Sequence, residues 1–330
     1  MIFVTGGSGL VGSFMLAALV ARGLPVRALY RQQIPQIPAA EAVEWVQGDI
    51  RDVLGLRDAL EGVTHVFHCA GLVSYAPQDE EELLRVNVEG VANLVDACLE
   101  RPGIRLGFVS SVAALGSGPT PTETELPATG PVLVDEQAKW DLGAAHNAYA
   151  TSKYLGELEV WRGVSEGLQA VMVNPSVILG PANWDRSSTR LFRYAYDEHW
   201  FYTPGRVNVV DVRDVVTTLI RLTLDTSRTG ERYVLSAGSL PLREFLAQAA
   251  SCFGKRPPTT AVPDWAAETI WRLEHVRSLL TGARPLITKD TARAGRRPTE
   301  YQADKIRREL GWEFRPLPET IRWCCQELVK

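Results

Sequence analysis

A cluster of glycines near the start of the chain constrains the fold more than any other sequence feature. Four glycines fall within seven residues in the stretch TGGSGLVG, between a short apolar run at 2–5 and a segment with helical spacing at 10–22. Gly6 permits a tight turn, Gly9 lets a pyrophosphate meet the backbone, and Gly12 lets the helix pack closely on the strand. The amino end of the helix adds N–H groups and a positive dipole. The turn therefore predicts a dinucleotide-binding strand–turn–helix unit.

Short apolar runs alternate with helical patterns through the first half of the chain. We expect helices near 10–22, 53–61, 80–100 and 147–166, and strands at 2–5, 26–30, 43–47, 65–70, 105–110 and 170–173, with one more beginning at Tyr233. These strands are too apolar to have a solvated face, which is typical of a parallel sheet covered on both sides. The sequence therefore predicts an α/β protein with a Rossmann-type, doubly wound parallel sheet.

The pattern changes at about residue 176, where aromatic-rich stretches broken by Pro and Gly begin. We expect a dinucleotide-binding domain formed by 1–175 and about 205–237. A smaller, mostly helical substrate-binding domain is expected from about 176–204 and 238–330. The segment 113–146 is rich in Gly, Pro and Thr and has no period, which indicates a long loop.

Composition argues against several classes of protein. The formal net charge is -4, so the chain lacks the basic bias of a nucleic-acid binder. Its five cysteines form an odd set without C-x-x-C spacing, which argues against a disulfide framework or a metal site and fits a reducing cytosol. We find no signal peptide pattern and no apolar run as long as a membrane span. A cytoplasmic protein without nucleic-acid or membrane partners is expected.

The end of the second strand predicts which dinucleotide is bound. An acidic residue there would hold the free 2′-hydroxyl of NAD, but the sequence VRALYRQ has Tyr30 and Arg31 instead. Because an arginine can pair with a 2′-phosphate, we expect NADP to be preferred over NAD; the alternative is that Arg31 is a solvated surface charge. Asp49, after the third strand, could accept the adenine amino group. His68 lies in an apolar strand and is expected to be packed rather than catalytic.

The stretch YATSK predicts catalytic chemistry. Tyr149 and Lys153 are four residues apart and so share one face of a helix. A phenol has a pKa of about 10, and a nearby ammonium moves that value toward the working pH. The fifth strand ends FVSSVAALG, and a serine at the carboxyl end of a parallel strand faces the ligand crevice. Ser110 and Ser111 compete for the role of hydrogen-bond donor to substrate, and we prefer Ser111.

These motifs together resemble a known family. TGGSGLVG, GDIRD, HCAG, NVEGVANLVDAC, VSSVAALG, YATSK, NPSVILGP and VNVVDVRDV occur in the order found in the extended short-chain dehydrogenase/reductases, the NAD(P)-dependent epimerase/dehydratase superfamily. The resemblance covers about residues 1–235 and is similar in detail to the dihydroflavonol reductase and 3β-hydroxysteroid dehydrogenase branch. It implies a Ser-Tyr-Lys triad at Ser111, Tyr149 and Lys153. Asn87 matches an asparagine of the family, although Val91 replaces the threonine of its NVxGT pattern.

The motifs and the resemblance together give an expected set of site residues. Cofactor contacts are expected at Gly6, Gly9, Leu10, Val11, Arg31, Asp49, Ile50, Ala70, Gly71, Tyr149, Lys153, Pro175 and Val177. Substrate contacts are expected at Ser111, Asn174, Trp184, Arg190 and Tyr194. The resemblance places the aromatic stretch 183–205 over the substrate, and aromatic walls suit a flat apolar or phenolic carbonyl compound. The alternative is that Phe192, Tyr196 and Trp200 form a core stripe at helical spacing.

Three functions remain open at this point. The first is an NADP-dependent carbonyl reductase or alcohol dehydrogenase acting on a small molecule. The second is a nucleotide-sugar epimerase or dehydratase, whose diphosphate could pair with arginines such as Arg190. A dehydratase usually has an acidic residue just after the serine, whereas Val112, Ala113 and Ala114 follow here. The third is a non-catalytic NADP-binding sensor. The resemblance also makes a homodimer plausible, with the helices near 80–100 and 147–166 at the interface.

Overall fold

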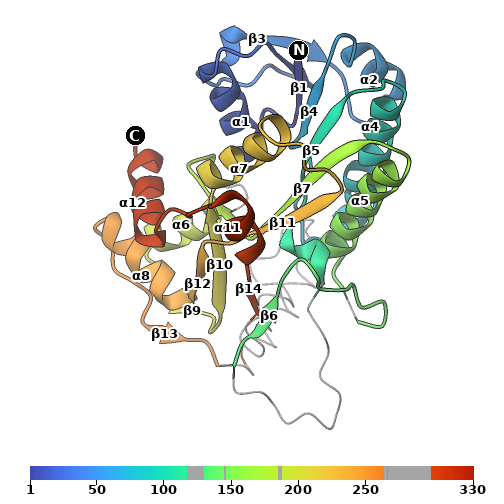
Figure 1. Cartoon of the computed structure of the whole chain (residues 1–330). Helices are drawn as coiled ribbons and strands as arrows, with labels where there is room; N and C mark the ends of the chain where they lie inside the picture. The colour runs from blue at the N-terminus through green and yellow to red at the C-terminus, as the bar shows by residue number, and fades with distance from the viewer. Residues whose placement is uncertain (117–129, 145, 185–187, 264–265, 267–298) are drawn as a thin grey trace.

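The structure is a computed structural model (Figure 1). It describes residues 1–116, 130–144, 146–184, 188–263, 266 and 299–330. Part of the loop expected at 113–146 and much of the segment expected to form helices after residue 241 therefore lie outside the described residues.

A seven-stranded parallel sheet forms the centre of the larger unit. The strand order is β11-β7-β5-β4-β1-β2-β3. Every neighbouring pair in it is parallel. The strands are β1 (Ile2–Thr5), β2 (Val26–Tyr30), β3 (Val43–Gln47), β4 (His65–His68), β5 (Arg105–Val109), β7 (Gln169–Pro175) and β11 (Glu231–Leu235). Each strand expected from the sequence is present within two residues at either end, so the predicted Rossmann-type sheet is confirmed.

The strand order marks the edge of the sheet where a ligand is expected. From β1 the chain continues to β2 and β3 on one side, and then returns to β4, β5, β7 and β11 on the other. A ligand of an open α/β sheet binds outside the carboxyl ends of the strands at such a reversal. The reversal lies between β1 and β4. Gly6 directly follows β1, and Gly71 lies three residues after the end of β4.

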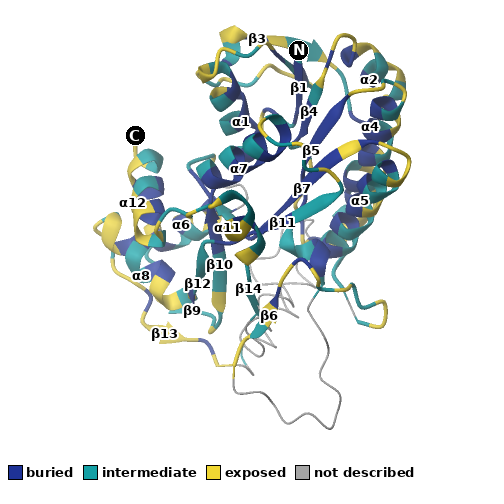
Figure 2. Ribbon diagram, in the orientation of Figure 1, coloured by how far each residue is buried: buried dark blue, intermediate teal, exposed yellow. Residues whose placement is uncertain are grey.

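Helices cover both faces of the sheet, as the apolar strands require (Figures 1 and 2). On one face lie α1 (Leu10–Ala21) and α7 (Val212–Leu224), which share a core with Ile2 and Val4. On the other lie α2 (Val53–Ala59), α4 (Gly90–Leu99) and α5 (Ala148–Ser165), which share a core with Phe3. Because alternate residues of β1 enter opposite cores, this strand has no solvated face.

The helix expected at 80–100 is interrupted. The structure has α3 (Glu80–Leu84), then a π-helical turn η3 (Arg85–Glu89), then α4. A π-helical turn inserts one extra residue into a helix and commonly marks a functional site. The spacing of apolar residues did not reveal the extra residue. Asn87 lies within this π-helical turn.

The smaller unit contains a short sheet as well as helices. Its three-stranded sheet has β10 (Arg206–Asp211) between β8 (Val177–Leu179) and β12 (Gly238–Pro241). Its core is completed by α6 (Thr189–Tyr196), α8 (Leu242–Cys252) and α12 (Leu317–Leu328). The segment 205–237, expected to return to the larger domain, is divided: β10 stays with the small sheet, whereas α7 and β11 join the larger unit.

Shorter elements complete the part of the chain that the structure describes. They are η1 (Ala40–Ala42), η2 (Pro77–Asp79), η4 (Val112–Leu115), β6 (Val132–Val134), β9 (Phe201–Tyr202), β13 (Thr260–Ala261), β14 (Thr299–Tyr301) and α11 (Asp304–Leu310). Within the described ranges, none of the helices combines the length and the apolarity needed to cross a bilayer.

Candidate active site

Strand β5 and helix α5 bring together the hydroxyl, phenol and amine that the sequence singled out. Ser111 follows β5 and caps η4, where its side chain accepts a hydrogen bond from Ala113 N at 3.2 Å. Tyr149 lies in the first turn of α5, close enough to the Ser111 side chain for that hydroxyl to act on the pKa of its phenol. Lys153, one turn later, donates from Nζ to Val109 O at 3.1 Å. The three groups therefore meet at the carboxyl edge of the sheet.

Burial changes the pKa of both titratable residues of the triad, Tyr149 and Lys153. Burial raises the pKa of Tyr149, and the hydrogen bond from Ser111 opposes this rise. Burial lowers the pKa of Lys153 to about 8, against the opposing effect of the Glu157 carboxylate. The sequence led us to expect a lowered pKa at Tyr149; the direction is opposite, because burial outweighs the stabilisation of the phenolate. Tyr149 is therefore a protonated phenol at neutral pH, which suits a proton donor.

The two neighbouring serines lie in different environments. Ser110 is 4% exposed and its Oγ donates to Glu157 Oε2 at 2.6 Å. Ser111 is half-buried and contacts Tyr149. The geometry favours Ser111 as the substrate-facing hydroxyl, as preferred from the sequence, because the hydroxyl of Ser110 is already bound inside the protein.

The glycine turn has the shape that a pyrophosphate needs. Gly6 has φ +74°, and a Cβ there would lie 2.6 Å from Ala70 Cα; a Cβ on Gly12 would overlap the Gly6 carbonyl. Gly9 is exposed and begins α1, and no side chain caps this helix end. The first N–H groups of the helix, beginning with Leu10 and Val11, are thus available to an anion. This cradle fits the pyrophosphate of a dinucleotide.

Two residues connect this cradle to the triad. Ala70 abuts Gly6, and a Cβ on the next residue, Gly71, would lie 3.9 Å from Lys153 Nζ and 3.4 Å from Asn87 Oδ1. Asn87 in turn binds both backbone groups of Leu72: its Oδ1 accepts from Leu72 N at 2.8 Å and its Nδ2 donates to Leu72 O at 2.9 Å. The segment after β4 therefore spans the distance from the glycine turn to Lys153, as an extended cofactor would.

Other expected cofactor residues also lie around this edge. Pro175 ends β7 and Val177 begins β8, where it is partly exposed. Ile50 is buried after β3 and packs against Gly90. These positions lie near the carboxyl ends of the strands, and their contacts with a cofactor stay a prediction.

Near the expected adenosine site, a second cationic side chain, Arg51, lies beside Asp49. Arg31 follows β2 and is exposed. The Asp49 carboxylate, expected to accept the adenine amino group, is held by Arg51 at 2.8 Å and 3.0 Å. This pair lowers the pKa of Asp49. Arg51 was missed from the sequence, although GDIRD places it two residues from Asp49.

His68 is a packed histidine, as expected. It is fully buried, its Nδ1 lies 2.8 Å from Thr5 Oγ1, and its ring stacks on Phe108 at 5.5 Å. Burial, with the nearby charge of Lys153, lowers its pKa to about 3, so it stays neutral.

Of the expected substrate residues other than Ser111, Asn174 is the one with a described contact to the triad. Asn174 is fully buried, and its Nδ2 donates to Ser111 O and Glu157 Oε2, so it lies behind the serine rather than in front of it. Trp184 packs against Tyr196 and Phe253. Among the described contacts, Trp184 has none with the triad.

The remaining substrate candidates lie on α6. The Tyr194 hydroxyl donates to Phe201 O at 2.6 Å, and its ring stacks on His199. Arg190 is exposed in the first turn of the helix. Their contacts with a substrate therefore stay predictions without a geometric link to Ser111.

The aromatic stripe proposed as a core is only partly one. Phe192 is fully buried and packs on Phe245 at 5.3 Å, whereas Tyr196 and Trp200 are 40% and 67% exposed. Two of the three side chains therefore lie at the surface of the smaller unit. The alternative of a core stripe does not hold at Trp200, because α6 ends at Tyr196 and Trp200 lies beyond the helix.

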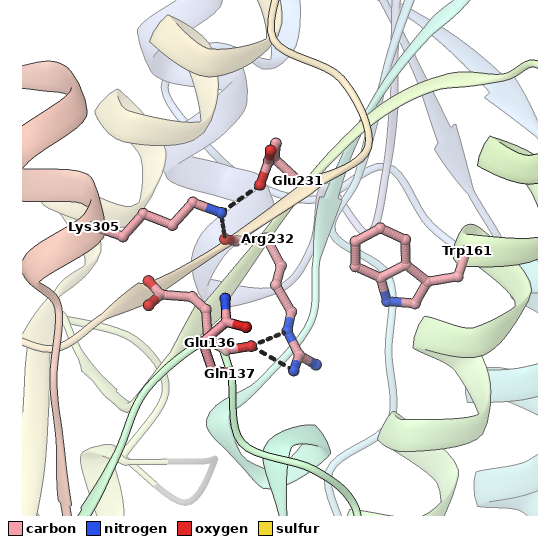
Figure 3. Close-up of a pocket in the computed structure, with 6 residues that line it drawn as sticks. All are labelled: Glu136, Gln137, Trp161, Glu231, Arg232 and Lys305. Carbon is pink, nitrogen blue, oxygen red and sulfur yellow. Dashed lines mark hydrogen bonds and ion pairs between the residues drawn. The ribbon is translucent and has the colours of Figure 1, made fainter.

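A charged crevice of about 290 Å³ lies apart from the triad (Figure 3). Its lining residues come from β11, α5, α11 and the segment after β6: Glu136, Gln137, Trp161, Glu231, Arg232 and Lys305. Arg232 extends between them and donates to Glu136 O. None of the expected site residues lines this crevice.

The fold and the site together define a class of protein. A parallel sheet with a glycine turn at its strand-order reversal, and a serine, tyrosine and lysine at the same edge, is the arrangement of a nicotinamide-nucleotide oxidoreductase of the short-chain type. The sequence pattern of the NAD dependent epimerase/dehydratase family matches residues 2–236. The chain belongs to this family, whose members typically use NAD(P), and is an extended short-chain dehydrogenase/reductase.

Individual relatives agree with this assignment. The chain is 32% identical over 324 residues to the Synechocystis protein named "Putative dihydroflavonol 4-reductase", covering 94% of this chain and 89% of the relative. It is 25% identical over 338 residues to cinnamoyl-CoA reductase 2 of Arabidopsis thaliana, covering 97% and 90%. The UDP-glucose 4-epimerase of Thermotoga maritima, solved with UDP-glucose, superposes with a TM-score of 0.78 at 15% identity, covering 99% and 98%; this likeness concerns the fold alone.

Proposed function

We propose that the protein is an NADP-dependent carbonyl reductase acting on a small apolar or aromatic molecule through Ser111, Tyr149 and Lys153. The observation that carries this proposal is the junction at the sheet edge. There the Lys153 amine lies beside Gly71, whose neighbour Ala70 abuts the glycine turn, and Tyr149, one helical turn before Lys153, lies close to the Ser111 side chain. A dinucleotide held by the glycine turn can thus reach the two hydroxyls.

Each triad residue has a role that its environment supports. A bound nicotinamide supplies the hydride. Tyr149, a phenol whose pKa is raised, donates its proton to the oxygen that becomes an alkoxide. Ser111 donates a hydrogen bond to the same oxygen and so stabilises its developing charge. Lys153, one helical turn from Tyr149, would hold the nicotinamide ribose.

A nucleotide-sugar epimerase or dehydratase is the competing function. In η4 the serine is followed by Val112, Ala113 and Ala114, which offer no acid or base for a dehydration. The two relatives described above are named as reductases. An epimerase recycles its hydride, so continuous loss of NADPH absorbance on adding ketones or aldehydes supports the reductase. Conversion of a UDP-hexose without NADPH loss would support the epimerase.

The direct test replaces the phenol alone. Tyr149→Phe removes the proton donor and keeps the ring, which packs on Tyr75 at 5.5 Å between centroids. We expect kcat for carbonyl reduction to fall by about 10²–10⁴-fold with unchanged NADPH affinity, measured by absorbance kinetics and fluorescence titration. Turnover equal to the wild type would remove Tyr149 from the mechanism. Wild-type protein that binds NADPH but reduces no compound in a broad carbonyl panel would instead support a non-catalytic sensor.

A further inference from the structure

Helix α5 carries a third polar residue on the stripe that holds Tyr149 and Lys153. Glu157 lies one helical turn beyond Lys153 and is only 2% exposed. A carboxylate so deeply buried is strongly destabilising unless donors surround it. Its partners therefore show what the position is built to hold.

Four donors surround this carboxylate, and three of them come from other elements. Oε2 accepts from Ser110 Oγ at 2.6 Å and from Asn174 Nδ2 at 2.7 Å. Oε1 accepts from Arg232 Nη1 at 2.9 Å and from Trp161 Nε1 at 3.4 Å. One side chain of α5 is thus bound to the ends of β5 and β7 and to β11.

The same carboxylate fixes both serines at the end of β5. Ser110 is bound directly through its hydroxyl. Ser111 is bound through Asn174, whose Nδ2 also donates to Ser111 O at 3.0 Å. The Ser111 backbone therefore cannot shift without disturbing Asn174 and Glu157.

Glu157 also supplies negative charge to the amine of the triad. Lys153 is 8% exposed, and its one described hydrogen bond is to a neutral carbonyl, Val109 O. The titratable groups that act on it include the carboxylate of Glu157 and the thiol of Cys69, and it lies beside the neutral ring of His68. Arg232 is the cation that faces Glu157 from β11. Because Glu157 lies four residues after Lys153 on the same helix face, its negative charge acts against the effect of burial on that amine.

We propose that Glu157 is a positioning residue of the triad, which fixes the Ser110–Ser111 backbone through Ser110 and Asn174 and acts as the counter-charge of Lys153. Its role in catalysis rests on the proposed reductase function. The competing explanation is that Glu157 serves stability alone as the partner of Arg232, which also donates to Glu136 O and Ala138 O (Figure 3). That explanation predicts that Glu157→Gln is less stable than the wild type, while the Lys153 pKa and the turnover per folded molecule are unchanged.

A lysine titration tests the counter-charge without any substrate. The chain has six lysines, so ¹³Cε-lysine labelling gives few NMR signals, and Lys153→Met assigns the one of interest. We expect Glu157→Gln to lower the Lys153 pKa by about one unit relative to the wild type. The matched control is Glu159→Gln on the same helix, which removes a carboxylate paired with Arg162 at 2.8 Å and should leave the Lys153 pKa unchanged. An unchanged pKa in Glu157→Gln would overturn the counter-charge role.

Steady-state kinetics test the positioning. We expect Glu157→Gln to lower kcat at least about tenfold, with less change in the KM for NADPH, and to move the alkaline fall of kcat/KM to lower pH. Glu159→Gln should retain wild-type values. A Glu157→Gln protein that loses only thermal stability, with the wild-type kcat and pH profile per folded molecule, would show a purely structural role.

A second variant covers the case in which Glu157→Gln does not fold. Ser110→Ala removes one hydrogen bond to the carboxylate and leaves its ion pair with Arg232 intact. We expect it to fold and to lose about threefold to tenfold in kcat, since a net hydrogen bond contributes about 1 kcal/mol; an unchanged kcat would refute the positioning of β5. If the wild type reduces no carbonyl compound, the proposed function fails, and the Lys153 titration still decides whether Glu157 is its counter-charge.

Discussion

At the scale of single residues, the site depends on how burial acts on two neighbouring groups of α5. Burial keeps Tyr149 protonated and makes Lys153 easier to deprotonate, because in each case it disfavours the charged form. The sequence predicted the pair from its spacing, and it predicted the serine from the position of a strand end. It did not predict Glu157 or Arg232, because their contact joins residues 75 positions apart and neither lies in a motif we used.

The Lys153 pKa predicts the pH dependence of the reaction. A lysine ordinarily titrates near 10.5, but burial lowers the pKa of Lys153 to about 8. The protonated amine is therefore present below about pH 8 and is lost as the pH rises through that value. We expect kcat/KM for carbonyl reduction to fall above about pH 8, measured with NADPH in buffers of constant ionic strength. A profile that stays flat to about pH 10 would show that this amine is not the group required.

Arg31 predicts the choice of cofactor. It is exposed at the end of β2, where the 2′-phosphate of NADP would lie, and Arg51 and Asp49 lie nearby. We expect Arg31→Ser to weaken NADPH binding about tenfold or more and to leave NADH binding unchanged, because the lost interaction is a charge-assisted hydrogen bond. The control is Arg22→Ser at the far end of α1, which pairs with Asp225. Tighter binding of NADH than NADPH by the wild type would refute the preference.

At the scale of secondary structure, the sequence predicted the elements of the large sheet better than the interruptions between them. The strands β1, β2 and β3 are predictable because most of their residues are apolar and Gly or polar residues follow. The π-helical turn at Asn87 is not, since one inserted residue barely changes an apolar pattern. The small strands β8 and β12 were also missed, because three or four residues are too few to show a period.

Gly156 shows why the interrupted helix and α5 fit together. A Cβ at this position would overlap Asn87 O, a backbone atom of η3 that cannot move aside like a flexible side chain. We expect Gly156→Ala to lower the free energy of unfolding by about 1–3 kcal/mol, measured by urea denaturation. Gly130→Ala is the control, because nothing lies within 4 Å of its added Cβ. Equal stability of Gly156→Ala and the wild type would contradict the close approach of the two elements.

At the scale of the whole molecule, buried polar contacts hold the smaller unit against the end of the larger one. Asp211, fully buried between β10 and α7, accepts from Thr320 Oγ1 of α12 at 2.9 Å. Asp214 of α7 accepts from Arg315 N at 2.9 Å. Figure 1 shows the resulting arrangement, with the small unit beside the sheet and α7 between them. The sequence indicated a second unit from its change in composition, but these contacts cross about 100 residues and no local pattern reveals them.

The central claim is that a dinucleotide bound at the glycine turn places its nicotinamide beside Ser111, Tyr149 and Lys153. A crystal structure of the wild type with NADPH measures this directly. We predict that the pyrophosphate contacts the Gly6–Gly12 turn, that the nicotinamide ribose contacts Lys153, and that the nicotinamide C4 faces the Tyr149 hydroxyl. A cofactor bound elsewhere, or a nicotinamide turned away from Tyr149 with the triad covered by protein, would contradict the account.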